Sequence, residues 1–146
     1  RSVALGLADS YGLRRDLVIA GAMLHDIGKL VELTYDTAID YSLEGNLVGH
    51  IVIGAGIVRE AARSVPDMPA QLALELEHMV LSHHGSKELG SPVKPMTAEA
   101  MVLAVADDLD AKLQQVRQHL AADTSTGAFT GYHRYLERVL LKPSRP

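Results

Sequence analysis

The stretch that decides the fold is A-G-A-M-L-H-D-I-G-K-L, residues 20–30. Its apolar residues recur at helical spacing, which predicts a helix packed into a core. His25 and Asp26 stand side by side in this helix, and Lys29 follows one turn later. A buried carboxylate without a partner is costly, so Asp26 needs a cation or a hydrogen-bond donor. Taken alone, these residues are explained most simply by a surface salt bridge between Asp26 and Lys29.

Helical patterns continue through most of the 146 residues, and no strand-like alternation is sustained. We expect helices over residues 2–9, 16–33, 47–64, 70–84, 97–122 and 132–142. Between them we expect loops over 34–46, 85–95 and 123–131 and a turn at 66–69. Gly12 should close the first helix, and Thr97 should cap the fifth. The predicted fold class is therefore all-α, a bundle of about six helices.

Composition narrows the possible functions. The chain is 47% hydrophobic and 22% charged, as in globular domains, and no apolar run is long enough to span a membrane. It has no cysteine, which rules out thiolate metal sites and fits the cytoplasm, the compartment we expect. A formal net charge of −4, five tyrosines and one phenylalanine argue against an autonomous nucleic-acid-binding module. A domain of this charge that acts on a polyanion needs cations from a metal or from another domain.

Three further motifs place polar residues beside apolar helical runs. His50 opens G-H-I-V-I-G-A-G-I-V, the pair at 83–84 lies in L-S-H-H-G, and three acids lie in A-V-A-D-D-L-D-A, residues 104–111. Each has an ordinary structural explanation: a satisfied core histidine, a polar helix end and a solvated helix face. Together with His25 and Asp26, however, they place imidazole and carboxylate donors on four separate helices. Such donors bind Zn, Fe, Mn or Ni, and bundle cores build such sites, so we predict a metal site in the bundle core.

The order of these motifs resembles that of the HD-domain metal-dependent phosphohydrolases. The resemblance rests on H-D at 25–26, His50, H-H at 83–84 and A-D-x-x-D-A at 106–111. Closer still, Y-S-L-E-G-N-L-V-G-H-I-V-I-G-A (41–55) and V-A-D-D-L-D-A-K (105–112) resemble the HD domain of the YhaM-type 3′→5′ exoribonucleases. The cyclic-dinucleotide phosphodiesterases share the metal motifs. Their G-Y-P signature is absent here, because the chain reads G-S-K-E-L-G-S-P after His84.

The resemblance implies two divalent metal ions, with Mn expected first and Fe, Co, Ni, Zn or Mg as alternatives. The implied ligands form two sets: His25, Asp26 and Asp107 for one ion, and Asp26, His50, His83 and additionally His84 for the other. Asp26 belongs to both sets and bridges the ions. Asp107 is preferred to Asp108 because it is the first aspartate of A-D-x-x-D-A.

The implied chemistry is phosphodiester hydrolysis. Two divalent ions about 3.5–4 Å apart lower the pKa of a bridging water, and hydroxide attacks phosphorus in line. Asp26 and Lys29 are the predicted catalytic residues, Asp26 as the bridge and Lys29 as the cation that neutralises a phosphate oxygen. Ser86 and Lys87, just after the histidine pair, are expected to contact substrate, although solvated loop residues explain them equally well.

The predicted function is that of the catalytic HD domain of a 3′→5′ exoribonuclease acting on single-stranded RNA. The alternatives are a nucleotide or cyclic-dinucleotide phosphohydrolase and a degenerate, non-enzymatic HD signalling domain. The chain begins with Arg1 rather than Met, and we expect residues 1–146 to be a single HD domain from a longer protein. Its missing N-terminal part should hold an RNA-gripping OB-fold domain and a helix with one more histidine. A homo-oligomer is compatible with the sequence.

Overall fold

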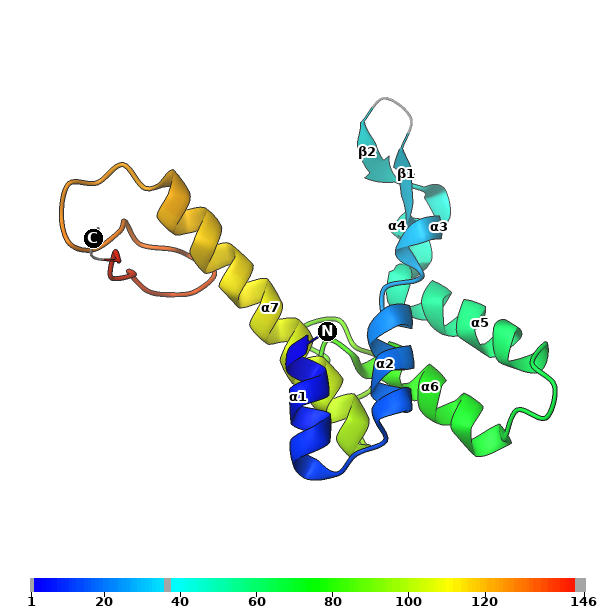
Figure 1. The fold of residues 1–146 in the computed structure, drawn as a ribbon. Coiled ribbons are helices and arrows are strands. Elements are labelled where there is room, and N and C mark those ends of the chain that lie inside the picture. The colour runs from blue at the N-terminus through cyan, green and yellow to red at the C-terminus, as the bar shows by residue number, and fades with distance from the viewer. Residues whose placement is uncertain (1, 36–37, 144–146) are drawn as a thin grey trace. The chain divides into compact units, whose positions relative to one another are not determined.

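Helices make up most of the chain in the computed structural model, which describes residues 2–35 and 38–143 (Figure 1). The elements in chain order are α1 (Ser2–Tyr11), α2 (Arg15–Leu24), α3 (Lys29–Glu32), β1 (Leu33–Tyr35), β2 (Ile39–Tyr41), α4 (Leu43–Val48), α5 (His50–Arg63), α6 (Ala70–Ser82) and α7 (Ala98–Ala122). The chain divides into two compact units, and the boundary between them falls after Asp107. Within the described ranges, none of the helices combines the length and the apolar character that crossing a membrane requires.

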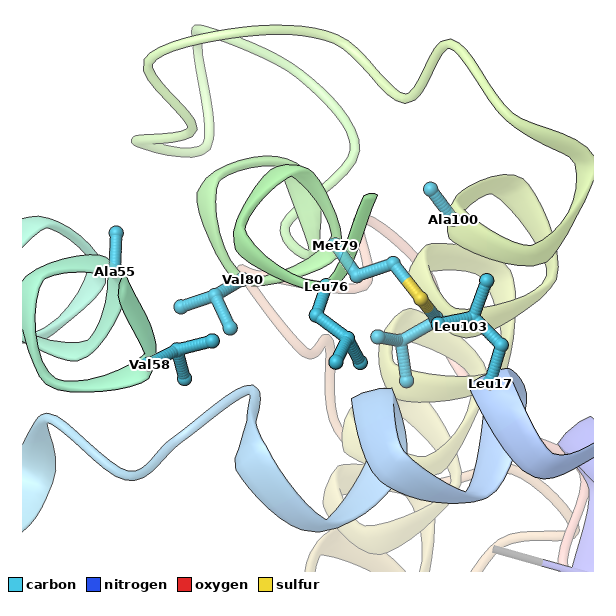
Figure 2. Close-up of a cluster of buried hydrophobic side chains, with 8 residues drawn as sticks. All are labelled: Leu17, Ala55, Val58, Leu76, Met79, Val80, Ala100 and Leu103. Atoms are coloured by element: carbon cyan, nitrogen blue, oxygen red, sulfur yellow. The ribbon is translucent and has the colours of Figure 1, made fainter. Parts of the chain in front are cut away.

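The main hydrophobic core of the first unit joins α2, α5, α6 and the first turns of α7. Its members are Leu17, Ala55, Val58, Leu76, Met79, Val80, Ala100 and Leu103 (Figure 2). Burying a side chain the size of leucine or methionine stabilises a fold by roughly 1.5–3 kcal/mol. The same four helices carry or adjoin the polar motifs of the sequence. The core therefore fixes where those motifs meet.

Several predicted helix boundaries are confirmed. Gly12 adopts a positive φ of 64° directly after α1, as a closing glycine should. The hydroxyl of Thr97 accepts a hydrogen bond of 3.1 Å from the backbone N–H of Ala100, which caps α7. The long helix ends at Ala122 as expected. Caps are local devices, and this is why sequence alone located these ends.

The straight helix expected over residues 16–33 is wrong, because the chain tightens at residues 25–28. There the backbone N–H of Ile27 donates to the Leu24 carbonyl (3.0 Å), and that of Lys29 donates to the Asp26 carbonyl (2.9 Å). These are three-residue steps, typical of a 3₁₀ turn rather than of an α-helix. Gly28 lies against the first turn of α5, and a Cβ atom on it would lie 2.0 Å from the His50 carbonyl oxygen. The turn thus brings the H-D pair directly against α5.

The loop expected over residues 34–46 is only partly a loop. β1 and β2 pair antiparallel, with Leu33 opposite Tyr41 and Tyr35 opposite Ile39, and residues 36–37 lie outside the described part. A short helix, α4, follows, and the Ser42 hydroxyl caps it by accepting from the Gly45 backbone N–H at 2.8 Å. The helix expected over 47–64 therefore begins later, at His50. The small sheet leaves the fold essentially all-α.

The helix expected over residues 132–142 is also wrong. This segment of the second unit forms turns and isolated bridges, pairing Phe129 with Leu141 and His133 with Arg138. Asp123 organises it by accepting hydrogen bonds from the Gly131 backbone N–H (3.0 Å) and from Lys142 Nζ (2.6 Å). The bond from Lys142 is the main reason that the pKa of Asp123 is held well below its usual value. These polar contacts outweigh the amphipathic pattern on which the helix prediction rested.

The close approach of Gly28 to α5 can be tested by substitution. We expect Gly28→Ala to lower the free energy of unfolding by about 3 kcal/mol, because the new methyl group collides with backbone that cannot move independently. Gly56→Ala in α5 is the matched control, since a Cβ there meets nothing within 4 Å. It should raise stability by about 1 kcal/mol, the helix propensity difference. Urea unfolding of both variants measures this, and equal effects would contradict the close packing.

Candidate metal centre

Four separate segments deliver the polar motifs to one place. His25 and Asp26 stand in the turn that follows α2, and His50 is the first residue of α5. His83 directly follows α6, and Asp107 lies in α7, with the hydrophobic core packed between these helices. His25, Asp26, His50 and His83 thus stand at or just beyond helix ends, whereas Asp107 lies within α7. The side chains of Asp26 and Asp107 stay partly exposed, at 38% and 34%.

The carboxylate of Asp26 is the centre of the cluster. Its Oδ1 lies 3.6 Å from His50 Nε2 and 3.7 Å from His83 Nε2. Its Oδ2 lies 3.5 Å from His25 Nε2. Two donors bound to one transition-metal ion lie about 3–3.4 Å apart, given metal–ligand distances near 2.1 Å. The observed spacings therefore need only a small inward movement to hold an ion.

Asp107 completes the second side of the cluster. Its Oδ1 lies 3.6 Å from His25 Nε2, so His25 stands between the carboxylates of Asp26 and Asp107. Asp108 pairs instead with Lys112, whose Nζ donates to Asp108 Oδ2 at 2.5 Å. The sequence motif contains both aspartates, and Asp107 is the one that lies close to a histidine of the cluster.

All four histidines of the cluster are anchored through the same ring nitrogen. Nδ1 of His25, His83 and His84 donates to the backbone carbonyl oxygens of Ala22 (3.1 Å), Val80 (2.7 Å) and Leu89 (2.8 Å). His50 Nδ1 donates to Glu32 Oε1 at 3.0 Å. A ring that donates through Nδ1 keeps its Nε2 lone pair for a metal. The four rings thus present the same acceptor atom.

Unpaired buried atoms provide the test of whether a metal fits here. Within the described residues, the buried side-chain atoms without a hydrogen-bond partner include Asp26 Oδ1, His50 Nε2 and His83 Nε2. These three atoms face one another at the distances given above. Buried polar atoms are rarely left unsatisfied, and three acceptors that converge on one point cannot satisfy each other. A cation between them resolves all three, so the donor set fits a divalent metal.

Two pKa shifts keep this donor set in its metal-binding form. Burial lowers the pKa of His83 to about 4, so its ring is neutral at pH 7. Burial raises the pKa of Asp26, but the hydrogen bond from Lys29 and the nearby His25 outweigh it, and the pKa lies below its usual value. Both groups therefore carry a free lone pair at neutral pH.

His84 stands at the edge of the cluster. Ring nitrogens of His50, His83 and His84 lie within 4.8 Å of one another, and the His83 and His84 ring centroids are 4.3 Å apart. His84 is close enough to serve as a further ligand to an ion at His50 and His83. The ligand role that the sequence resemblance implied for His84 stays a prediction.

Lys29 contacts the cluster, whereas Ser86 and Lys87 belong to the loop beside it. Lys29 Nζ donates to Asp26 Oδ2 at 2.7 Å, which is the salt bridge that the opening stretch allowed. The carbonyl of Ser86 accepts from the backbone N–H groups of Leu89 (3.3 Å) and Ser91 (3.0 Å), and that of Lys87 accepts from Gly90 (3.0 Å). These backbone hydrogen bonds shape the loop. The substrate contacts of the Ser86 and Lys87 side chains stay a prediction.

Sequence reasoning missed Glu32. This buried carboxylate, at the end of α3, accepts hydrogen bonds from both the backbone N–H and the ring of His50. The only signal was an acid inside the apolar run L-V-E-L. Sequence alone gave no means of telling that its partner lies 18 residues further on.

Comparison with known proteins shows that the chain belongs to the HD domain family. Residues 2–112 match the HD domain family. Three similar curated proteins are each described as a 3′-5′ exoribonuclease YhaM. The one from Geobacillus sp. (strain WCH70) is 43% identical over 97% of this chain, and those from Bacillus subtilis and Bacillus licheniformis are each 42% identical over 82%. The chain spans only 38–44% of the length of these relatives. No solved structure matches it.

The metal centre predicts that the protein retains divalent transition metal without any cysteine. After incubation with Mn²⁺ and Zn²⁺ and removal of free ions, elemental analysis should find bound metal. The His83→Ala variant should lose most of the bound metal, because only Asp26 Oδ1 and His50 Nε2 then remain of the three converging acceptor atoms. His78→Gln on the same helix is the control, since His78 Nε2 only accepts from the Met96 backbone N–H at 2.9 Å. A parent protein that stays metal-free would refute the assignment.

Proposed function

The chain belongs to the HD domain family, and we propose that it hydrolyses phosphodiester bonds at the cluster around Asp26. One observation carries this proposal: the two oxygens of the Asp26 carboxylate lie close to different histidines, Oδ1 to His50 and His83 and Oδ2 to His25. A carboxylate placed in this way could hold two ions, and pairs of ions stabilise the attacking and leaving oxygens in phosphatases and nucleases. Membership in the family implies a divalent metal, and the unpaired acceptor atoms of Asp26, His50 and His83 fit one.

The proposed ligands are two sets that share Asp26. His50, His83 and His84 would hold one ion with Asp26 Oδ1, and His25 and Asp107 would hold the other with Asp26 Oδ2. Ions bound there supply a water of lowered pKa and neutralise phosphate oxygens. We propose Mn, with Fe, Co, Ni, Zn or Mg as alternatives, because carboxylates suit Mn and Mg, whereas imidazoles suit Fe, Ni and Zn. The number and identity of the ions are parts of the proposal.

Lys29 is the proposed phosphate contact. Its ammonium lies 2.7 Å from Asp26 Oδ2 and is partly exposed, so it can reach an oxygen of a bound substrate without leaving the site. A fixed cation beside the reacting phosphate stabilises the charge that develops in the transition state. Asp26, held by Lys29 and surrounded by three histidines, remains ionised and oriented throughout. Lys29 thus contributes to charge stabilisation, whereas Asp26 is required for metal binding.

RNA is the proposed substrate, and release of nucleotides from its 3′ end is the proposed reaction. The support is the activity of the similar proteins from Geobacillus and Bacillus subtilis, which are described as 3′-5′ exoribonucleases. These 146 residues carry a formal charge of −4, so we propose that a segment outside them holds most of the RNA. For an enzyme of RNA turnover, the cytoplasm is the compartment we propose.

Two substitutions separate the roles of Asp26 and Lys29. Asp26→Ala should lose metal and all phosphodiester hydrolysis. Lys29→Ala should keep its metal but hydrolyse RNA about 10²–10³ times more slowly, because one preorganised cationic contact is lost. Asp108→Ala is the matched control, since it removes another aspartate that is paired with a lysine. Metal content and turnover of the full-length protein measure all three.

The competing interpretation makes different predictions for the same variants. If Asp26 and Lys29 only form a surface salt bridge, both variants stay active and lose at most about 1 kcal/mol of stability. Full metal content and full activity in Asp26→Ala would therefore end the proposal. Hydrolysis of a mononucleotide or cyclic dinucleotide, with RNA left intact, would support metal-dependent hydrolysis at this site but contradict RNA as the substrate.

The acidic charge predicts that residues 1–146 alone hold RNA poorly. We expect the dissociation constant for a single-stranded RNA to exceed about 10⁻⁴ M, the weak end of nonspecific binding, when it is measured by fluorescence anisotropy at low salt in EDTA. Adding Mn²⁺ should strengthen binding, because the ions offset the acidic residues around the site. Tight binding in EDTA would reveal a basic surface and contradict the proposal that a segment outside residues 1–146 holds most of the RNA.

A further inference from the structure

Glu32 is a buried carboxylate that pairs with no lysine or arginine among the residues that the structure describes. Glu32 is 7% exposed, and within the described residues the hydrogen bonds and the ion pair of its carboxylate all go to His50. Glu77 and Glu99 are buried to the same degree, at 9% and 7% exposure. Each of these two pairs with an arginine, Arg59 for Glu77 and Arg14 for Glu99. Glu32 therefore differs from the other buried glutamates in the source of its counter-charge.

The contact with His50 fixes both the backbone and the ring of that residue. Glu32 Oε1 accepts from the His50 backbone N–H at 2.8 Å and from ring Nδ1 at 3.0 Å. His50 opens α5, where backbone N–H groups have no partner within the helix. The carboxylate thus satisfies one of these groups and sets the ring orientation through a single oxygen. With Nδ1 occupied, Nε2 is left facing Asp26 Oδ1 at 3.6 Å.

Glu32 is itself held rigidly from its main chain. Its carbonyl oxygen accepts from the Ser42 backbone N–H at 2.8 Å. Gly45 packs against the same carbonyl so closely that a Cβ on it would lie 2.2 Å away. Contacts between the end of α3 and the start of α4 therefore hold the backbone of Glu32 in place. A side chain fixed in this way can position another one.

The other three histidines of the cluster donate Nδ1 to neutral backbone carbonyls, and only His50 donates to a carboxylate. A carboxylate on Nδ1 makes the imidazole a stronger metal ligand than a carbonyl does. A cation on Nε2 also compensates the buried charge of Glu32 through the ring, as arginine does for Glu77 and Glu99. Glu32 and a metal at His50 thus stabilise each other.

We propose that Glu32 is a positioning residue of the metal centre, which orients His50 and strengthens it as a ligand. The inference rests on the proposed function, because it presupposes that His50 binds a divalent ion. It does not make Glu32 a ligand, since its contacts are to the far side of the ring. It assigns to this carboxylate a role in metal affinity rather than in folding alone.

The test compares Glu32→Gln with Glu77→Gln by titration calorimetry with Mn²⁺ on the full-length protein. Glutamine keeps the size and an acceptor oxygen but removes the charge. Glu32→Gln should bind Mn²⁺ about 10–100 times more weakly, the usual loss for a carboxylate behind a metal-binding histidine. Glu77→Gln, which removes an equally buried glutamate elsewhere, should bind like the parent. Parental affinity in Glu32→Gln would overturn the proposal.

A second comparison separates positioning from a general structural effect. In a His50→Ala background, Glu32→Gln should cause no further loss of Mn²⁺ affinity, because its effect is transmitted through His50. The same loss in both backgrounds would mean that Glu32 supports the fold rather than the ligand, and would overturn the proposal.

A spectroscopic measurement on the unmodified protein needs no variant to fold. Nitrogen-15 NMR of the histidine rings should show His50 protonated at Nδ1, with Nε2 shifting when Zn²⁺ is added. A His50 ring protonated at Nε2 would refute the inference. A parent protein that binds no metal in any of these experiments would instead refute the proposed function, so the two failures are distinguishable.

Discussion

The contact between Gly28 and the first turn of α5 is the constraint on which the site depends. Because Gly28 has no side chain, the turn at 25–28 can lie directly against the backbone of His50. Any larger residue would separate the H-D pair from α5 by about the width of a methyl group. Residues 25 and 26 would point about 100° apart on a straight helix. The tight turn instead directs both toward the histidines of α5 and α6.

The site is assembled by a division of labour between apolar and polar residues. Leu17, Val80 and Leu103, with the rest of the core, fix the positions of the helices. Backbone carbonyls at the ends of those helices then fix the histidine rings through Nδ1. This arrangement uses groups that every helix end exposes. Only the ring of His50 lies at a helix start, where no such carbonyl is available, and Glu32 takes that place.

The all-α fold class could be predicted from the sequence, and so could the residues that meet in the cluster, but several backbone features around the cluster could not. His25, Asp26, His50, His83 and Asp107 are conspicuous because polar residues stand next to apolar helical runs, and the structure brings these five together. The break before Lys29 was not predictable, because its cause is a contact with a segment more than 20 residues away. The segment 132–142 has a helical pattern, but Asp123 holds it in turns through bonds that no periodicity reports. Glu32 was missed for a similar reason: its partner is distant in sequence.

The two oxygens of Asp26 are not equivalent, and this has a consequence for the order of events at the site. Oδ2 already receives a hydrogen bond from Lys29, whereas Oδ1 is buried and receives none. An ion at Oδ1 would meet an oxygen that accepts no hydrogen bond from the described residues, with the Nε2 atoms of His50 and His83 beside it. An ion at Oδ2 would share its oxygen with an ammonium group. If two ions bind as proposed, the two positions should therefore differ in occupancy and in exchange rate, with the Oδ1 position filled first and emptied last.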